Sequence, residues 1–292
     1  RRMGLIKYVM ALMNGARLGI AAQSVGVSEL AYREAHQYAM ERRQFGKAII
    51  EFPAVSEMLA VMKAKLDASR ALLYECSRFV DMYKIYEDIA RERSLTPDER
   101  AEMKHYSRLA DALTPLAKGL GSEYCNQNAY DCIQIHGGSG FMKDYACERL
   151  YRDARITSIY EGTTQLQVVA AIRHVTTGTY LNWIKEQEAL ECLPEDQNVK
   201  ETLMFMTQQF AAAVEKVMGV DDQEYHDFMA RRLVEMAGYI VMGYLLLDDT
   251  KRNGAFRTSL HVFVRMGQAI VAGHADFIEN FRAEDTKEYL FS

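Results

Sequence analysis

The sequence contains few residues that interrupt helices and few patterns that build strands. Only four of its 292 residues are proline, so long helices can run without the kink that a proline ring imposes. Apolar and polar residues seldom alternate as they do along a half-buried strand, whereas apolar residues recur at helical spacing. No stretch of about eighteen uncharged apolar residues is present, which argues against a membrane-spanning helix. These absences predict an all-α protein without a transmembrane segment.

Cysteine and histidine lack the spacings of redox and metal sites. The five cysteines are odd in number and form no CxxC pair, so reduced thiols packed in a cytosolic core are expected. No two of the seven histidines stand four residues apart, so no metal site is predicted. The net charge of −5 argues against nucleic acid as a main partner. We expect a cytoplasmic protein, because no secretory signal is visible. The chain starts abruptly inside a helical pattern, which suggests a fragment.

Apolar stripes at helical spacing indicate long helices that pack as an up-down, four-helix-type bundle. Pro53 suits the first turn of the second helix, and Gly137-Gly138 ends the third. Residues 84–104 are charge-dense and indicate either a loop or a frayed helical extension. The first domain is predicted to cover residues 1–178, with helices over residues 4–40, 53–80, about 105–135, 145–156 and 164–177.

A second helical bundle is predicted for residues 179–292, with Gly254 between its last two helices. Gly243, Gly267 and Gly273 fall inside helical patterns, where each glycine costs about 1 kcal/mol against alanine. We expect close helix crossings to explain them. The expected helices of this second domain cover residues 205–217, 224–247 and 255–281.

One short segment carries the strongest chemical signal. Glu161 stands in Ile159-Tyr160-Glu161-Gly162-Thr163-Thr164-Gln165, on a predicted non-helical link before a helix. Thr164 with Gln167 three residues later fits a capping box. A carboxylate beside the N–H groups of a helix start is well placed to take a proton from a substrate carbon. Taken alone, the segment favours an ordinary loop acid beside a helix cap.

Four blocks in order identify a family. They are residues 13–17 (MNGAR), 39–47 (AMERRQFGK), 134–141 (QIHGGSGF) and 151–155 (YRDAR), the last running on toward Glu161. Together they resemble the C-terminal helical domain of the acyl-CoA dehydrogenases, flavoenzymes that place a trans double bond between Cα and Cβ of an acyl-CoA. The resemblance covers residues 1–178, and a helical tail such as residues 179–292 is found in larger members.

The resemblance implies a catalytic role for Glu161 as the base that removes the α-proton, while the β-hydride passes to FAD. It implies that Asn14, Arg17 and Tyr160 lie at the acyl-CoA substrate. It also implies that the FAD-binding positions are Arg42, Gln44, Phe45, Gln134, Gly137, Gly138, Gly162, Thr163, Thr164 and Gln165.

Each of these assignments has a simpler structural alternative. Arg42 could be a solvated cation that offsets a helix dipole, and Gly137-Gly138 could serve as a helix C-cap, alone or in addition to a cofactor contact. Asn14 and Arg17 could form the polar face of the first helix. In the family, Arg42 and Phe45 meet the flavin of a neighbouring subunit, which implies a homodimer or homotetramer.

Three departures from the family pattern argue against full FAD binding and activity in this chain alone. Pro53 replaces a glutamine that touches the flavin in many relatives, residues 84–104 look inserted, and the N-terminal and middle domains are missing. We therefore expect the isolated chain to bind FAD weakly and to be inactive. The resemblance further implies an electron-transfer flavoprotein as acceptor. One alternative is a non-catalytic helical oligomerisation or interaction module. Another is a DNA-repair-linked branch of the superfamily, but the acidic balance of the chain argues against it.

Overall fold

The computed structural model describes residues 2–289, with side chains from Met13 onward. Ten α-helices, four short 3₁₀ turns and one two-stranded hairpin are present in this range, which confirms the all-α prediction. The chain forms two compact units that divide between Gln167 and Val168. This division falls inside helix α6 (Thr164–Thr176), whereas the domain boundary predicted at residues 178/179 lies just beyond that helix and stays a prediction.

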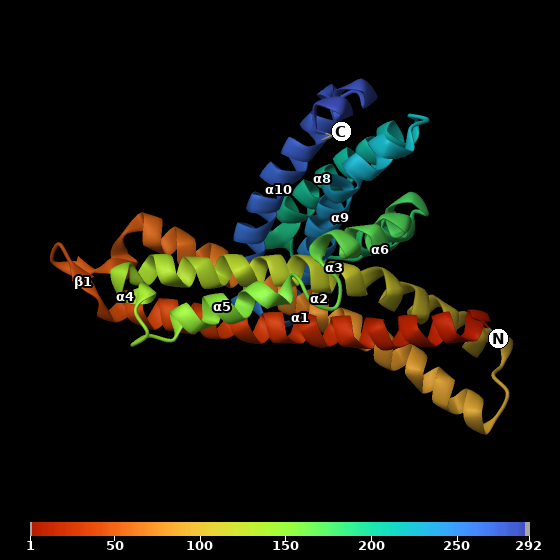
Figure 1. The fold of residues 1–292 in the computed structure, drawn as a ribbon, viewed down its shortest axis with the longest axis horizontal. Coiled ribbons are helices and arrows are strands. Elements are labelled where there is room, and N and C mark those ends of the chain that lie inside the picture. Colours follow the sequence, from red (N-terminus) through yellow and green to blue (C-terminus); the bar gives the residue numbers. More distant parts are fainter. Residues whose placement is uncertain (1, 290–292) are drawn as a thin grey trace. The chain divides into compact units, whose positions relative to one another are not determined.

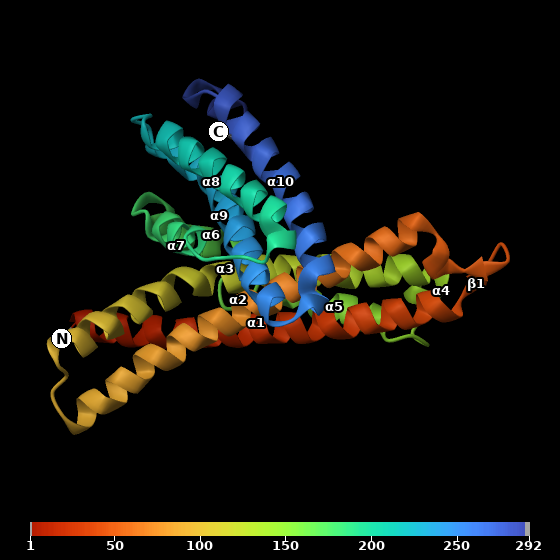
Figure 2. The same cartoon turned by 180° about the vertical axis from the view of Figure 1, so that it is seen from behind.

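Three helices of 40 residues each build the first unit. Helices α1 (Arg2–Glu41), α2 (Pro53–Glu92) and α3 (Pro97–His136) run lengthwise beside one another, and α5 (Cys147–Thr157) lies along α1 and α3 (Figures 1 and 2). Ala31, Ala35 and Ala39 of α1 are completely buried. Their spacing of four puts them on one face, and their small side chains let the neighbouring helices approach closely.

The connection from α1 to α2 is more ordered than the turn that the sequence predicted. Strands β1 (Arg43–Gln44) and β2 (Lys47–Ala48) pair antiparallel, and the 3₁₀ turn η1 (Ile49–Glu51) follows. The two-residue loop Phe45-Gly46 has positive φ at both positions, 50° and 82°, as a type I′ hairpin turn requires. Pro53 is the first residue of α2, as predicted.

Residues 84–104 are almost entirely helical, so the helical-extension alternative is correct and the loop is wrong. Helix α2 continues to Glu92, and α3 begins at Pro97. Thr96 caps α3 through a reciprocal pair of hydrogen bonds with Glu99. Ion pairs in this segment join Arg91 with Asp88, one helical turn apart in α2, and Arg93 with Glu99 across the break between the helices.

Helix α3 ends where the sequence predicted. Gly137 takes φ 61°, a conformation that favours glycine, and the single turn α4 (Gly138–Phe141) follows before α5. Tyr38 near the end of α1 stacks on His136 with ring centroids 4.2 Å apart. The hairpin and α4 therefore lie at the same end of this unit (Figure 1).

The second unit contains three long helices and one that the sequence analysis missed. The missed helix is α7 (Thr179–Glu188), which precedes the first helix expected in residues 179–292. Gly243 and Gly267 lie at close crossings, as expected, but nothing lies within 4 Å of a Cβ added at Gly273, so that expectation is wrong. The remaining elements are η2 (Pro194–Asp196), α8 (Gln197–Met218), α9 (Gln223–Arg252), η3 (Gly254–Phe256), α10 (Arg257–Asn280) and η4 (Ala283–Glu288).

The cysteines are free, as predicted, and four of the five are packed in the core. These four are Cys76, Cys125, Cys132 and Cys147. None of the helices described for residues 2–289 combines the length and the apolar character that a membrane crossing requires.

Candidate functional site

Glu161 lies on the link between α5 and α6 in an unusual backbone conformation. Its φ is 54°, and Gly162 after it has φ 96°. A side chain in the left-handed region costs about 1–2 kcal/mol, so surrounding contacts must hold the link in place. The residue is exposed. The structure thus presents this carboxylate at the surface on a backbone bend that the rest of the unit enforces.

Two buried side chains donate hydrogen bonds to the backbone of this link. Lys118 of α3 donates from Nζ to the carbonyl oxygen of Gly162 at 2.6 Å, and Gln167 of α6 donates from Nε2 to the same oxygen at 2.9 Å. Lys118 is completely buried and Gln167 is 1% exposed. A Cβ added at Gly119 would lie 3.2 Å from Cβ of Gln167, so this glycine lets α6 approach α3.

The predicted capping box is wrong in detail. Thr164 is the first residue of α6, not its cap, and its hydroxyl donates to Glu123 at 2.5 Å. The side-chain amide of Gln167 turns back to the link carbonyls instead of capping a threonine. The sequence signal located the start of the helix correctly but could not show that its polar side chains bind a neighbouring helix.

Lys118 was not singled out in the sequence. It stands among small and apolar residues of α3, where a helical pattern cannot tell a buried lysine from an exposed one. Burial is the main cause that lowers its pKa from 10.5 to about 8, and the nearby cation of Arg17 lowers it further. The carboxylates of Glu123 and Glu161 act in the opposite direction.

The predicted substrate residues of α1 also lie near this link. Tyr160 donates a hydrogen bond to Gln23 of α1, and Nη2 of Arg17 is 3.8 Å from the position of a Cβ added at Gly162. Asn14 donates to Asp111 of α3 at 2.8 Å and accepts from Arg17. Arg17, which is only 6% exposed, therefore lies beside Gly162 and contacts Asn14, while Tyr160 ties the link to α1.

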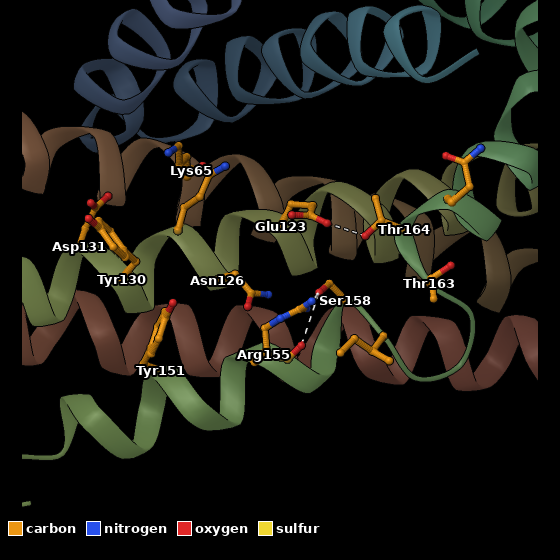
Figure 3. Close-up of a pocket in the computed structure, with 13 residues that line it drawn as sticks. Lys65, Glu123, Asn126, Tyr130, Asp131, Tyr151, Arg155, Ser158, Thr163 and Thr164 are labelled. Atoms are coloured by element: carbon orange, nitrogen blue, oxygen red, sulfur yellow. Dashed lines mark hydrogen bonds between the residues drawn. The ribbon is translucent and has the colours of Figure 1, made fainter. Parts of the chain in front are cut away.

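A pocket of about 730 Å³ opens beside the link (Figure 3). Three predicted cofactor positions, Thr163, Thr164 and Gln165, line it, whereas Glu161 and Gly162 do not. Arg155 lies within the pocket and donates to Ser158 at 2.6 Å. The lining that sequence reasoning missed mixes charges, amides and rings: Lys65, Glu123, Asn126, Gln127, Tyr130, Asp131, Tyr151, Arg155, Ser158 and Ile159.

Charge in this pocket is nearly balanced. Lys65 is 9% exposed; burial lowers its pKa and raises that of Asp131, while each charge favours the ionised form of the other. The rings of Tyr130 and Tyr151 lie 6.4 Å apart between centroids. A pocket with polar groups and aromatic faces suits a ligand that is partly planar and partly polar.

The other predicted cofactor residues form a second group at the far end of the unit. Arg42, Gln44, Phe45 and Gln134 are all exposed there, and the Phe45 ring is 92% exposed at the hairpin tip. Nothing lies within 4 Å of a Cβ added at Gly137 or Gly138, so backbone is open to an approaching group. The residues from Lys118 to Gly137 span roughly 28 Å at about 1.5 Å per helical residue. The predicted site is therefore divided into two regions of one chain.

One cluster in the core contains side chains of metal-binding type. Cys132, His136 and Cys147 bring possible ligand atoms within 4.8 Å of one another. Burial raises the pKa of both thiols, and Nδ1 of His136 is 2.8 Å from the carbonyl oxygen of Cys132. Alanines and aliphatic side chains surround the thiols, so protonated core packing accounts for the cluster. The absence of a metal site stays a prediction.

Curated proteins of known name are similar to this chain in sequence over little more than half of its length. The chain is 39% identical over 158 residues to the caffeyl-CoA reductase-Etf complex subunit CarC of Acetobacterium woodii, which covers 54% of this chain and 35% of that protein. It is 36% identical over 170 residues to an acyl-CoA dehydrogenase of Bacillus subtilis, covering 58% of this chain and 38% of that one. The chain thus spans little more than a third of the length of these curated relatives.

Solved structures share the fold over almost the whole chain. An acyl-CoA dehydrogenase from Bacillus anthracis complexed with FAD superposes with a TM-score of 0.72 at 22% identity, covering 93% of this chain and 50% of that one. ACDH-11 of Caenorhabditis elegans in complex with C11-CoA also gives 0.72, at 19% identity, over 95% of this chain and 49% of its own. At these identities the likeness concerns the fold.

Family models cover both units. The model described as acyl-CoA dehydrogenase, C-terminal domain, matches residues 6–176, and the one described as acyl-CoA dehydrogenase C terminal matches residues 176–286. The chain therefore belongs to the acyl-CoA dehydrogenase family, which it matches through C-terminal domains.

Proposed function

We propose that this chain is the base-carrying C-terminal part of an FAD-dependent oxidoreductase that introduces a trans-2,3 double bond into an acyl-CoA, with Glu161 as the base. The observation that carries the proposal is the presentation of Glu161. Its carboxylate is exposed, while its left-handed backbone is fixed by buried donors to the next carbonyl. A base must reach its proton in a defined geometry, and this link supplies both access and rigidity.

The proton step is the part that this chain performs. The α-proton of a thioester is weakly acidic, so the carboxylate needs help from groups that stabilise charge on the thioester oxygen. In the first turn of α6 the N–H of Thr164 already donates to the carbonyl oxygen of Ser158. The next N–H groups, those of Gln165 and Leu166, have no acceptor within the helix and can serve that purpose together with the N–H of Glu161. When bound, FAD supplies the acceptor for the β-hydride, which no side chain can provide.

The residues of this chain fit FAD as two half-sites. Thr163, Thr164 and Gln165 line the pocket beside the base, and Gly137-Gly138 offer open backbone near exposed Arg42 at the other end. Arginine suits a pyrophosphate because its planar fork binds phosphate oxygens in pairs. We infer that the half-sites serve two different flavins, so that each flavin is held between subunits of a homodimer or homotetramer.

The acceptor and the direction of the reaction belong to the same proposal. The similar protein of Acetobacterium woodii is named a subunit of a reductase-Etf complex, which supports an electron-transfer flavoprotein as the partner here. If the reaction runs toward the saturated acyl-CoA, Glu161 returns the proton to Cα, because a base in one direction is the acid in the other.

Proton exchange tests the assignment without requiring an electron acceptor. In a polypeptide that joins this chain to its N-terminal and middle domains, an acyl-CoA in D₂O should exchange its α-protons for deuterium, as followed by mass spectrometry. Glu161→Gln should slow this exchange about 10²- to 10⁴-fold. Glu57→Gln, which removes an exposed carboxylate of α2, should leave it unchanged.

The same experiment separates the alternative function. Exchange that persists at the original rate in Glu161→Gln would contradict the base assignment. A flavin-free protein that neither exchanges protons nor oxidises any acyl-CoA would support a helical oligomerisation or interaction module without catalysis.

A further inference from the structure

We propose that Lys118 is a positioning residue whose ammonium group fixes the backbone at Glu161 by holding the carbonyl of Gly162. Its effect on the reaction rests on the proposed function, since that is where Glu161 acts as a base. Its hold on the link does not, because the hydrogen bond belongs to this chain alone.

The geometry places Lys118 directly behind the bend. Its Nζ reaches the Gly162 oxygen at 2.6 Å from a helix that is remote in sequence. The space beside Gly162 is occupied: a Cβ there would lie 2.8 Å from Nε2 of Gln167 and 3.8 Å from Nη2 of Arg17. The Gly162 carbonyl therefore accepts hydrogen bonds from side chains of two helices, α3 and α6, and φ is positive at both Glu161 and Gly162.

Structural stability alone does not explain a lysine at this position. A fully buried ammonium group is costly unless it is well paired, and the group that it binds directly is a neutral carbonyl that Gln167 also satisfies. Facing charges are mixed: Arg17 of α1 repels it, whereas Glu123 of α3 and Glu161 of the link attract it. An apolar side chain of similar length would fill the space without the free-energy cost of burying a charge. The stability of the fold therefore does not explain why a charged donor stands here.

Holding the link supplies the reason for a charged donor. A hydrogen bond from a charged donor is about twice as strong as a neutral one, and the ammonium also attracts the Glu161 carboxylate across the bend. The two interactions act together on the backbone conformation that presents the base. Gln167 by itself offers a neutral amide, which binds the carbonyl but does not attract the carboxylate.

Hydrogen exchange on the chain itself tests the hold. Lys118→Met keeps the length of the side chain and removes donor and charge, and Lys118→Gln restores a neutral donor. Lys104→Met changes an exposed lysine of the same helix and serves as the matched control. We expect backbone amides of residues 159–167 to exchange at least tenfold faster in Lys118→Met, less so in Lys118→Gln, and unchanged in Lys104→Met, with equal far-UV circular dichroism.

Kinetics of the holoenzyme test the positioning role. Lys118→Met should lower kcat at least tenfold with little change in KM, because substrate contacts remain while the base is misplaced. Unchanged exchange of residues 159–167 would overturn the proposal. So would faster exchange with an unaltered kcat. Should Lys118→Met not fold, Lys118→Gln decides by the same criteria. Failure of the Glu161 assignment would be seen separately, in the Glu161→Gln exchange assay.

Discussion

Gly140 gives a sharp test of the packing that shapes the turn after α3. A Cβ added there would lie 2.8 Å from both Cβ of His136 and the carbonyl oxygen of Ile133, and 3.0 Å from Cα of Ile133. Two of these atoms belong to the backbone of α3 and cannot rotate away. Gly140→Ala must therefore displace α4 from the end of α3.

Overpacking of this kind costs about 1–3 kcal/mol. For a protein of this size each kcal/mol lowers Tm by roughly 2–4 °C, so a fall of about 2–12 °C is expected. Gly138→Ala is the matched control, because it lies in the same short turn with nothing within 4 Å of the added Cβ. Surface changes of that type stay within about 0.5 kcal/mol.

The assay compares both variants with the original chain by thermal and urea unfolding, followed by far-UV circular dichroism. The reasoning is refuted if Gly140→Ala and Gly138→Ala have equal midpoints.

Three further predictions concern other parts of the chain. In the second unit, Gly243→Ala should lower the free energy of unfolding by about 1–3 kcal/mol, because its Cβ would lie 2.5 Å from Cδ2 of Leu203. Gly273→Ala should be neutral or stabilising. Equal effects in urea denaturation would contradict a close helix crossing at Gly243. The pKa of Lys118 falls from 10.5 to about 8 on folding. Between about pH 8 and pH 10.5 the unfolded chain therefore binds more protons than the folded one. Over this range the residue makes the free energy of unfolding rise by up to about 1.4 kcal/mol per pH unit. Lys118→Met should lack that rise, and an identical pH profile would count against the burial. If the two proposed half-sites serve different flavins, this chain alone should quench no FAD fluorescence saturably below tens of micromolar. Stoichiometric binding would show that this chain suffices to hold the cofactor.

Helix content and the family were accessible from the sequence because both depend on local signals. Apolar stripes at a period near 3.6 predict helices wherever they occur, and Pro53 and Gly137 mark ends through their own backbone restrictions. The motif around Glu161 was recognisable because a carboxylate, a glycine and a helix start are contiguous. The charge-dense segment of residues 84–104 was ambiguous, since exposed helices and loops share a polar composition.

What holds the candidate site together was decided by tertiary structure alone. Lys118 and Gln167 are separated in sequence, and only the close approach of α6 to Gly119 brings both side chains onto the Gly162 carbonyl. Sequence spacing also could not reveal that the predicted cofactor residues divide into two regions along α3, because distance along a chain does not determine distance in space. The sequence by itself determined the family and the candidate residues for the chemistry, whereas the packing of the long helices decided which of these candidates lie close together.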